Sequence, residues 1–141
     1  MNILTDSNYF YALLNPFDSL HEKAIYLSQK IKDDNATLFV NEYIILETLT
    51  IISQRINKQL AIDLGNSFLK EDGVSLIYVN EEIFQNTWRI FKQNINKNIS
   101  FADCSLIATI QDRPIDALLT FDLTDFKQLQ IPYHFNLYYK G

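Results

Sequence analysis

The 141-residue sequence has few of the residues that stabilise a chain by means other than a packed core. It contains one cysteine, which excludes an internal disulfide and a zinc cluster built from thiolates and fits a reducing cytoplasm. Three glycines and three prolines leave no low-complexity segment or linker. No apolar run approaches the roughly 18 residues of a membrane span, and the N-terminus lacks the features of a secretory signal. We therefore expect a cytoplasmic protein that makes no use of a membrane.

Basic residues are also scarce. Twelve Lys and Arg stand against seventeen Asp and Glu, which gives a net charge of −5 and a pI near 4.9. This balance argues against tight, non-specific binding of nucleic acid by the whole surface. A local basic strip, or a metal ion that recruits phosphate to an acidic site, remains compatible with it. Hydrophobic residues make up 48% of the chain, enough for one globular domain that we expect to span residues 1–141.

Short β-rich segments alternate with segments of helical spacing. Strands are expected at Asn2–Thr5, Thr37–Val40, Val74–Val79 and Ala117–Thr120, with a final edge strand at Tyr133–Tyr139. Helices are expected over about 8–14, 19–31, 59–70, 81–93 and 100–110, and another begins at Asn41, a plausible N-cap. This alternation is typical of an α/β fold, here a parallel sheet of four to five strands between two layers of helices. Ligands of such sheets bind beyond the carboxyl ends of the strands.

Four carboxylates are predicted to lie at that edge of the sheet. Asp6 directly follows the first strand, and Asp122 follows the strand ALLT after one intervening residue. Glu47 lies about two turns into the helix after the second strand, in the otherwise apolar run IILETLTII. Asp103 is in the first turn of the helix that begins near Ser100.

Each of these residues also has a structural interpretation. Asp6 could be simply the N-cap of the next helix, with no other role. Asp103 fits the acidic position of a Ser-x-x-Asp capping box. Asp122 and Asp125 could be ordinary turn or cap residues. Glu47 is harder to explain in this way, since a buried carboxylate is costly unless it is paired or coordinated. The joint pattern favours a site over four independent coincidences.

A cluster of carboxylates needs a compensating positive charge, and no Lys, Arg or His adjoins any of the four in sequence. A divalent metal ion would supply it. Ligation by oxygen alone selects a hard ion, Mg²⁺ or Mn²⁺, rather than zinc. Such ions polarise phosphoryl oxygens and lower the pKa of a bound water. The pattern therefore predicts metal-dependent hydrolysis of phosphodiesters.

The ordered motifs LTDSN, NEYIILET, SFADCSLIA and LLTFDLTDF resemble the PIN-domain ribonucleases, especially the VapC-type toxins of toxin–antitoxin pairs. The resemblance covers essentially the whole chain. It implies an Mg²⁺/Mn²⁺-dependent endoribonuclease that forms a homodimer and is inhibited by an antitoxin protein encoded beside it. The residues that match the acidic metal site of the family are Asp6, Glu47, Asp103 and Asp122, with Asp125 at a position that is often acidic and Ser7 and Thr120 where hydroxyls commonly lie beside the metal.

Other functions remain open at this point. The motifs do not separate toxins from housekeeping PIN nucleases that process RNA. An aspartyl-phosphate phosphatase would use Asp6 as its nucleophile, but it would need a second aspartate two residues on, where the chain has Asn8. A non-catalytic binding module would fill the acidic cluster with an arginine of its partner. Five basic residues could contact RNA or merely be solvated: Arg55, Lys58, Arg89, Lys92 and Lys97. Cys104 is interpreted as a packing residue.

Overall fold

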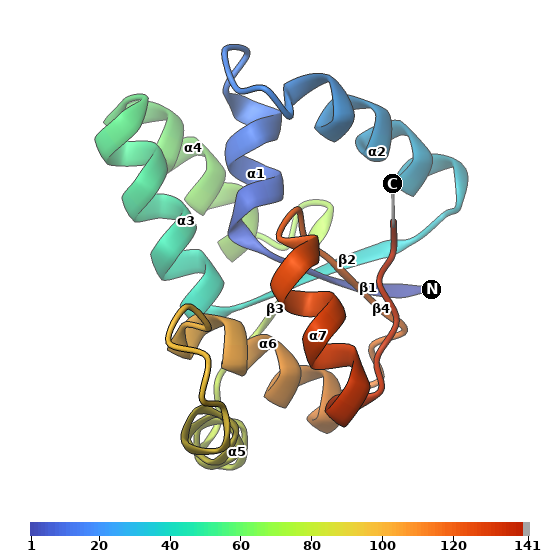
Figure 1. The fold of residues 1–141 in the computed structure, drawn as a ribbon. Helices are drawn as coiled ribbons and strands as arrows, with labels where there is room; N and C mark the ends of the chain where they lie inside the picture. The colour runs from blue at the N-terminus through green and yellow to red at the C-terminus, as the bar shows by residue number, and fades with distance from the viewer. Residues whose placement is uncertain (140–141) are drawn as a thin grey trace.

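The protein, described here by a computed structural model over residues 1–139, contains a four-stranded sheet with helices on both sides (Figure 1). The strands are β1 (Asn2–Thr5), β2 (Thr37–Asn41), β3 (Val74–Ile77) and β4 (Ala117–Leu119). The helices are α1 (Ser7–Leu14), α2 (His21–Asp33), α3 (Glu42–Arg55), α4 (Lys58–Leu69), α5 (Glu81–Gln93), α6 (Phe101–Asp112) and α7 (Leu123–Tyr133). The predicted α/β class is confirmed.

All strand pairs are parallel, and the order across the sheet is β3-β2-β1-β4. Parallel strands need both faces covered, so they are expected to be apolar throughout. Ile3, Leu4, Val40 and Leu118 indeed have no exposed surface. In Figure 1, α1 to α4 lie on one side of the strands, and α5 and α6 lie on the other. None of the described helices is long and apolar enough to cross a membrane.

Short polar side chains determine where the helices begin. The side chains of Asn41, Asn57, Asn80 and Ser100 each accept a hydrogen bond from a backbone N–H in the first turn of α3, α4, α5 or α6. Such caps satisfy donors that the helix itself leaves without partners. The predicted cap at Asn41 is confirmed, and α5 has the predicted bounds.

Asn41 also joins two helices that belong to different parts of the chain. Its side chain is fully buried, and its amide nitrogen donates to Ser105 Oγ at 3.2 Å and to Thr109 Oγ1 at 3.1 Å on α6. Its oxygen accepts from the Ile44 amide at 3.0 Å. A buried amide left without these partners would cost about 1–3 kcal/mol. The start of α3 is therefore held against α6.

The C-terminal region differs from the sequence prediction in two ways. No strand spans Tyr133–Tyr139; within the described chain this segment pairs with β4 only through one bridge, between Leu118 and Leu137. Tyr133 instead ends α7, an element that the sequence reasoning missed, and His134 takes a left-handed conformation that stops the helix. Buried Phe135 and Leu137 alternate with exposed Asn136, which is the burial pattern of a strand. The pattern covers too few residues for a continuous ladder of hydrogen bonds with β4.

The strand order places a switch point between β1 and β4. The chain leaves β1 toward β2 on one side, whereas β4 pairs with β1 on the other side. Connections on opposite sides of neighbouring strands open a crevice at their carboxyl ends, where ligands of open α/β sheets bind. Asp6 and Thr120 directly follow these two strands.

Candidate active site

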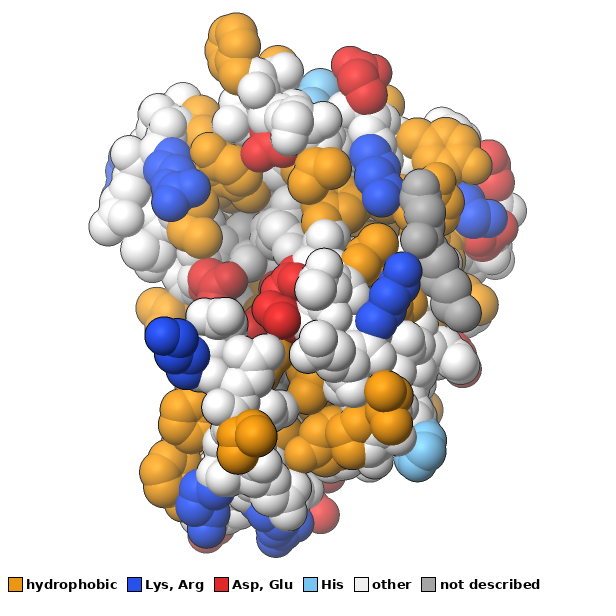
Figure 2. Space-filling model, viewed as in Figure 1, with side chains coloured by type: hydrophobic (Ala, Val, Ile, Leu, Met, Phe, Trp, Pro, Cys, Tyr) orange, Lys and Arg blue, Asp and Glu red, His pale blue; other side chains and the backbone are white. Residues whose placement is uncertain are grey.

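The four carboxylates predicted from the sequence line one pocket of about 410 Å³, called the acidic pocket here. Asp6 comes from the end of β1, Glu47 from α3, Asp103 from α6 and Asp122 from the segment after β4. Figure 2 shows acidic side chains gathered in a hollow near the middle of one face. The fold therefore brings together residues that lie up to 116 positions apart, from Asp6 to Asp122, as the parallel topology required.

Asp6 is at the centre of a hydrogen-bonded network across the two strand ends. Its Oδ2 accepts from Thr120 Oγ1 at 2.8 Å, and its Oδ1 accepts from the Ser7 amide at 2.7 Å. Thr120 Oγ1 in turn accepts from the Asp122 amide at 3.1 Å and from Asn8 Nδ2 at 3.3 Å. Asp6 thus caps α1, as its structural interpretation proposed, while it also faces the pocket.

The pKa of Asp6 is raised to about 7, chiefly by burial and also by the negative charges of Asp103 and Glu47. The hydrogen bonds from Thr120 and Ser7 act in the opposite direction, because they stabilise the ionised form. Desolvation prevails since the side chain is 4% exposed. At neutral pH, a positive ion in the pocket would favour the carboxylate over the acid.

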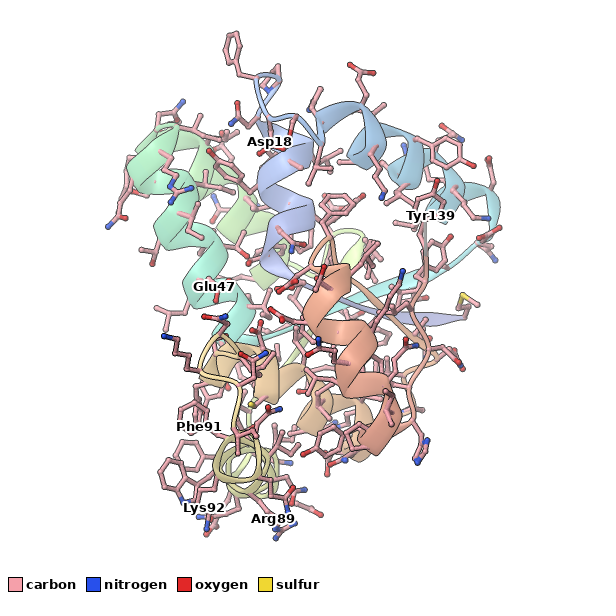
Figure 3. All side chains as sticks on the ribbon, in the orientation of Figure 1. Asp18, Glu47, Arg89, Phe91, Lys92 and Tyr139 are labelled. Carbon is pink, nitrogen blue, oxygen red and sulfur yellow. The ribbon has the colours of Figure 1, made fainter. Side chains whose placement is uncertain are left out.

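Glu47 is half-buried, and its Oε1 accepts a short hydrogen bond from the Ser7 hydroxyl. Ser7 follows Asp6 and is itself buried, so it joins α1 to α3 at the pocket. Figure 3 shows Glu47 on α3. The carboxylate that is unusual in an apolar stretch of sequence is therefore directed to the pocket, while Ile44, Thr48 and Ile52 on the same helix are buried.

Asp103 both caps a helix and lines the pocket. Its Oδ2 accepts from the Ser100 amide at 3.0 Å, and its own amide donates to Ser100 Oγ at 3.0 Å, which completes the predicted capping box. Burial raises the pKa of Asp103, and the charges of Asp122 and Glu47 raise it further, although the bonds from Ser100 oppose this. The capping and site interpretations are therefore compatible at this position.

Asp122 and Asp125 begin α7. Asp122 is its N-cap, and its Oδ1 accepts from the Asp125 amide at 3.5 Å. Burial raises the pKa of Asp122, and the neighbouring charge of Asp125 adds to this effect. Asp125 does not line the acidic pocket; it lines an adjacent one, where Asn96 Nδ2 approaches its Oδ1 at 3.5 Å.

The donor set suits a hard cation. Within residues 1–139 no Lys, Arg or His forms an ion pair with any of the four carboxylates. Glu47 Oε2 and Asp103 Oδ1 make no hydrogen bond to described residues, so each offers a free oxygen. Within residues 1–139, no group of three Asp, Glu, Cys or His side chains is arranged closely enough to hold a metal ion in the conformation described.

Of the five basic residues named from the sequence, Arg55 alone lines the acidic pocket. The guanidinium carbon of Arg55 lies 5.9 Å from the centre of the Tyr11 ring. Arg89 and Lys92 lie on α5, well away from Glu47 in Figure 3. Asn8, Tyr11 and Thr48 also line the pocket and were not predicted. Asn8 and Tyr11 lie within one or two helical turns of Asp6, and Thr48 adjoins Glu47, a proximity that could have indicated them.

Cys104 is not placed to react. It is fully buried on α6, and burial raises the pKa of its thiol to about 11, so the thiolate is not available near neutral pH. The prediction that it is a packing residue is confirmed.

The sequence predicted a parallel α/β sheet with carboxylates gathered at the carboxyl ends of its strands, and the structure has this arrangement. The PIN-domain profile matches residues 3–131. The chain therefore belongs to the PIN-domain family.

Solved structures of similar fold agree with this assignment. VapC20 of Mycobacterium tuberculosis, described as a sarcin-ricin loop cleaving toxin, is 20% identical with a TM-score of 0.77, over 90% of this chain and 94% of that one. FitAcB from Neisseria gonorrhoeae is 16% identical with a TM-score of 0.64, over 97% and 96%. VapBC2 from Rickettsia felis, bound to a DNA fragment from its promoter, is 13% identical with a TM-score of 0.62, over 91% and 92%. No curated protein matches the sequence.

Proposed function

We propose that this protein is a metal-dependent endoribonuclease and the toxin of a toxin–antitoxin pair. The observation that carries the proposal is the convergence of Asp6, Glu47, Asp103 and Asp122 on one pocket, without a basic partner among the described residues. Family membership supports nuclease chemistry. The likeness in fold to VapC20, a toxin that cleaves RNA of the sarcin-ricin loop, supports RNA as the substrate.

Asp6, Glu47, Asp103 and Asp122 would hold Mg²⁺ or Mn²⁺, with Asp125 assisting from beside Asp122. When bound, such an ion polarises the scissile phosphate and neutralises charge that develops in the transition state. The hydroxyls of Thr120 and Ser7 would fix Asp6 and Glu47 through the bonds described above. Arg55 would contact a phosphate of the RNA at the rim of the pocket.

The direct test is cleavage of a labelled single-stranded RNA by the purified protein. We expect cleavage with Mn²⁺ or Mg²⁺ and none with EDTA, because the carboxylates alone would repel the phosphate. The same sequence as DNA provides the control for substrate class. Cleavage that persists in EDTA would contradict metal dependence, and equal cleavage of DNA would contradict a ribonuclease.

The proposal includes an antitoxin partner, a homodimer and a cytoplasmic location. Neighbours of similar fold are VapBC and FitAB toxin–antitoxin complexes, which supports the antitoxin. A housekeeping PIN nuclease would share the same site chemistry. Arrest of growth on expression, relieved by the product of the adjacent gene, would separate a toxin from such an enzyme.

The other two candidate functions are less well supported. An aspartyl-phosphate phosphatase would need a lysine near Asp6, and none lines the acidic pocket. A binding module that receives an arginine from a partner would use the same carboxylates, but it would leave RNA intact with every metal ion.

A further inference from the structure

A second pocket, of about 350 Å³, adjoins the acidic pocket. Its lining comes from the end of α5, the segment joining α5 to α6, and helix α7. Four carboxamide side chains line it, and we call it the amide pocket: Gln93, Asn94, Asn96 and Gln128. Asp125 lines it too and connects the two pockets, because its amide donates to Asp122 in the acidic pocket.

The remaining wall of the amide pocket is apolar and includes one aromatic ring. Ile99 and Leu129 are buried beneath it, and Pro132 and the half-buried Tyr133 form one side. The Tyr133 hydroxyl donates to Gln93 Oε1 at 3.1 Å, which fixes both side chains. An apolar wall with one aromatic ring, beside carboxamides, is suited to a planar ligand with a polar edge.

Several polar atoms of this pocket are available to a ligand. The Gln128 side chain makes no hydrogen bond to residues 1–139. Gln93 and Asn94 each use only the side-chain oxygen, which accepts from the Tyr133 hydroxyl and from the Asn96 amide respectively, so their amide nitrogens are available. No basic residue lines the pocket, and Asp125 is its one acidic residue, so the lining disfavours a phosphate. The pocket therefore suits a ligand without negative charge.

We propose that the amide pocket binds an unpaired base of the RNA, next to the phosphate held at the acidic pocket. The inference rests on the proposed function and adds a determinant of its specificity. Carboxamides match the donor and acceptor pattern of base edges, and proteins read RNA sequence mainly from unpaired bases that are stacked and hydrogen-bonded in this way. The base would stack on the Tyr133 and Pro132 side and pair its edge with Gln128 and Asn94.

The test measures binding, separately from cleavage. Fluorescein-labelled rA₁₀, rC₁₀ and rU₁₀ and an abasic chain of the same length are titrated in Mn²⁺ against protein carrying Asp103→Asn, which prevents degradation of the probes. Gln128→Met keeps the side-chain length but removes the amide, and Asn94→Leu does the same at the second position. Gln111→Met, an exposed glutamine on α6, is the matched control.

We expect one homopolymer to bind at least about tenfold more tightly than the abasic chain, because only a chain with bases can stack in the pocket and hydrogen-bond there. Gln128→Met and Asn94→Leu should each remove most of this preference, without change in Mn²⁺ affinity by calorimetry, whereas Gln111→Met retains it. The proposal is overturned if the abasic chain binds as tightly as the best RNA, or if both pocket variants keep the preference. Cleavage by protein with Asp103 intact is scored separately, so a failed base site and a failed nuclease assignment remain distinct.

Discussion

Asp103→Asn is expected to reduce RNA cleavage by roughly 100-fold or more while leaving the protein folded. Loss of a residue that merely orients a metal ligand typically costs 10- to 100-fold, and removal of a ligand charge should cost more. The fold should survive because an asparagine oxygen can still accept from the Ser100 amide and preserve the capping box. The measurement is single-turnover cleavage of labelled RNA in Mn²⁺, with thermal melting of both proteins.

Asp112→Asn, at the other end of α6, is the matched control for this substitution. Asp112 pairs with exposed Arg113 and lines neither pocket described here. The substitution Asp112→Asn removes the same charge from the same helix but outside the acidic pocket, so this variant should cleave RNA like the wild type. Equal cleavage by Asp103→Asn and the wild type would remove Asp103 from the site, and equal loss in both variants would point to a general effect of charge.

The second large effect is a loss of stability of the metal-free protein as pH rises. The pKa of Asp6 in the folded protein is about 7, against an ordinary value of 3.8. Between these values the native state binds more protons than the unfolded state, so the free energy of unfolding falls with increasing pH. The contribution of Asp6 to the free energy of unfolding is fully present below about pH 4 and is lost as pH rises through about 7. The loss amounts to roughly 4 kcal/mol.

Thermal melting in EDTA at pH 5 and pH 8 measures this effect. The wild type should lose more stability over this interval than Asp6→Asn, whose amide does not titrate, and the comparison cancels groups common to both proteins. Mn²⁺ should restore the wild type at pH 8 and have little effect on the variant. Parallel pH profiles for the two proteins would show that the ionisation of Asp6 does not cause the loss of stability.

The sequence predicted the location of the site better than its internal contacts. Asp6 and Asp122 followed from their places after buried strands, and Glu47 followed from its unusual position in an apolar run. The convergence of Asp6 and Asp122 follows from the parallel topology, which hydrophobic periodicity reveals well. The bonds from Ser7 to Glu47 and from Thr120 to Asp6 depend on how helices pack on the sheet, which no local pattern specifies.

The segment after β4 was harder to predict for a related reason. Helix α7 begins with Asp122 and Asp125, which look like turn residues, and it contains Pro132 in its last turn. Its buried residues Phe126 and Leu129 give a short and weak helical period. The amide pocket lies between α7 and the α5–α6 connection, so missing the helix also concealed the pocket.

The buried amide of Asn41 affects more than the start of one helix. It ties α3, which carries Glu47, to α6, which carries Asp103, through Ser105 and Thr109. With this brace in place, the two carboxylates cannot relieve their mutual repulsion by moving the helices apart. The acidic pocket is therefore preorganised on two of its sides, because the backbones that carry Glu47 and Asp103 are held in place relative to each other.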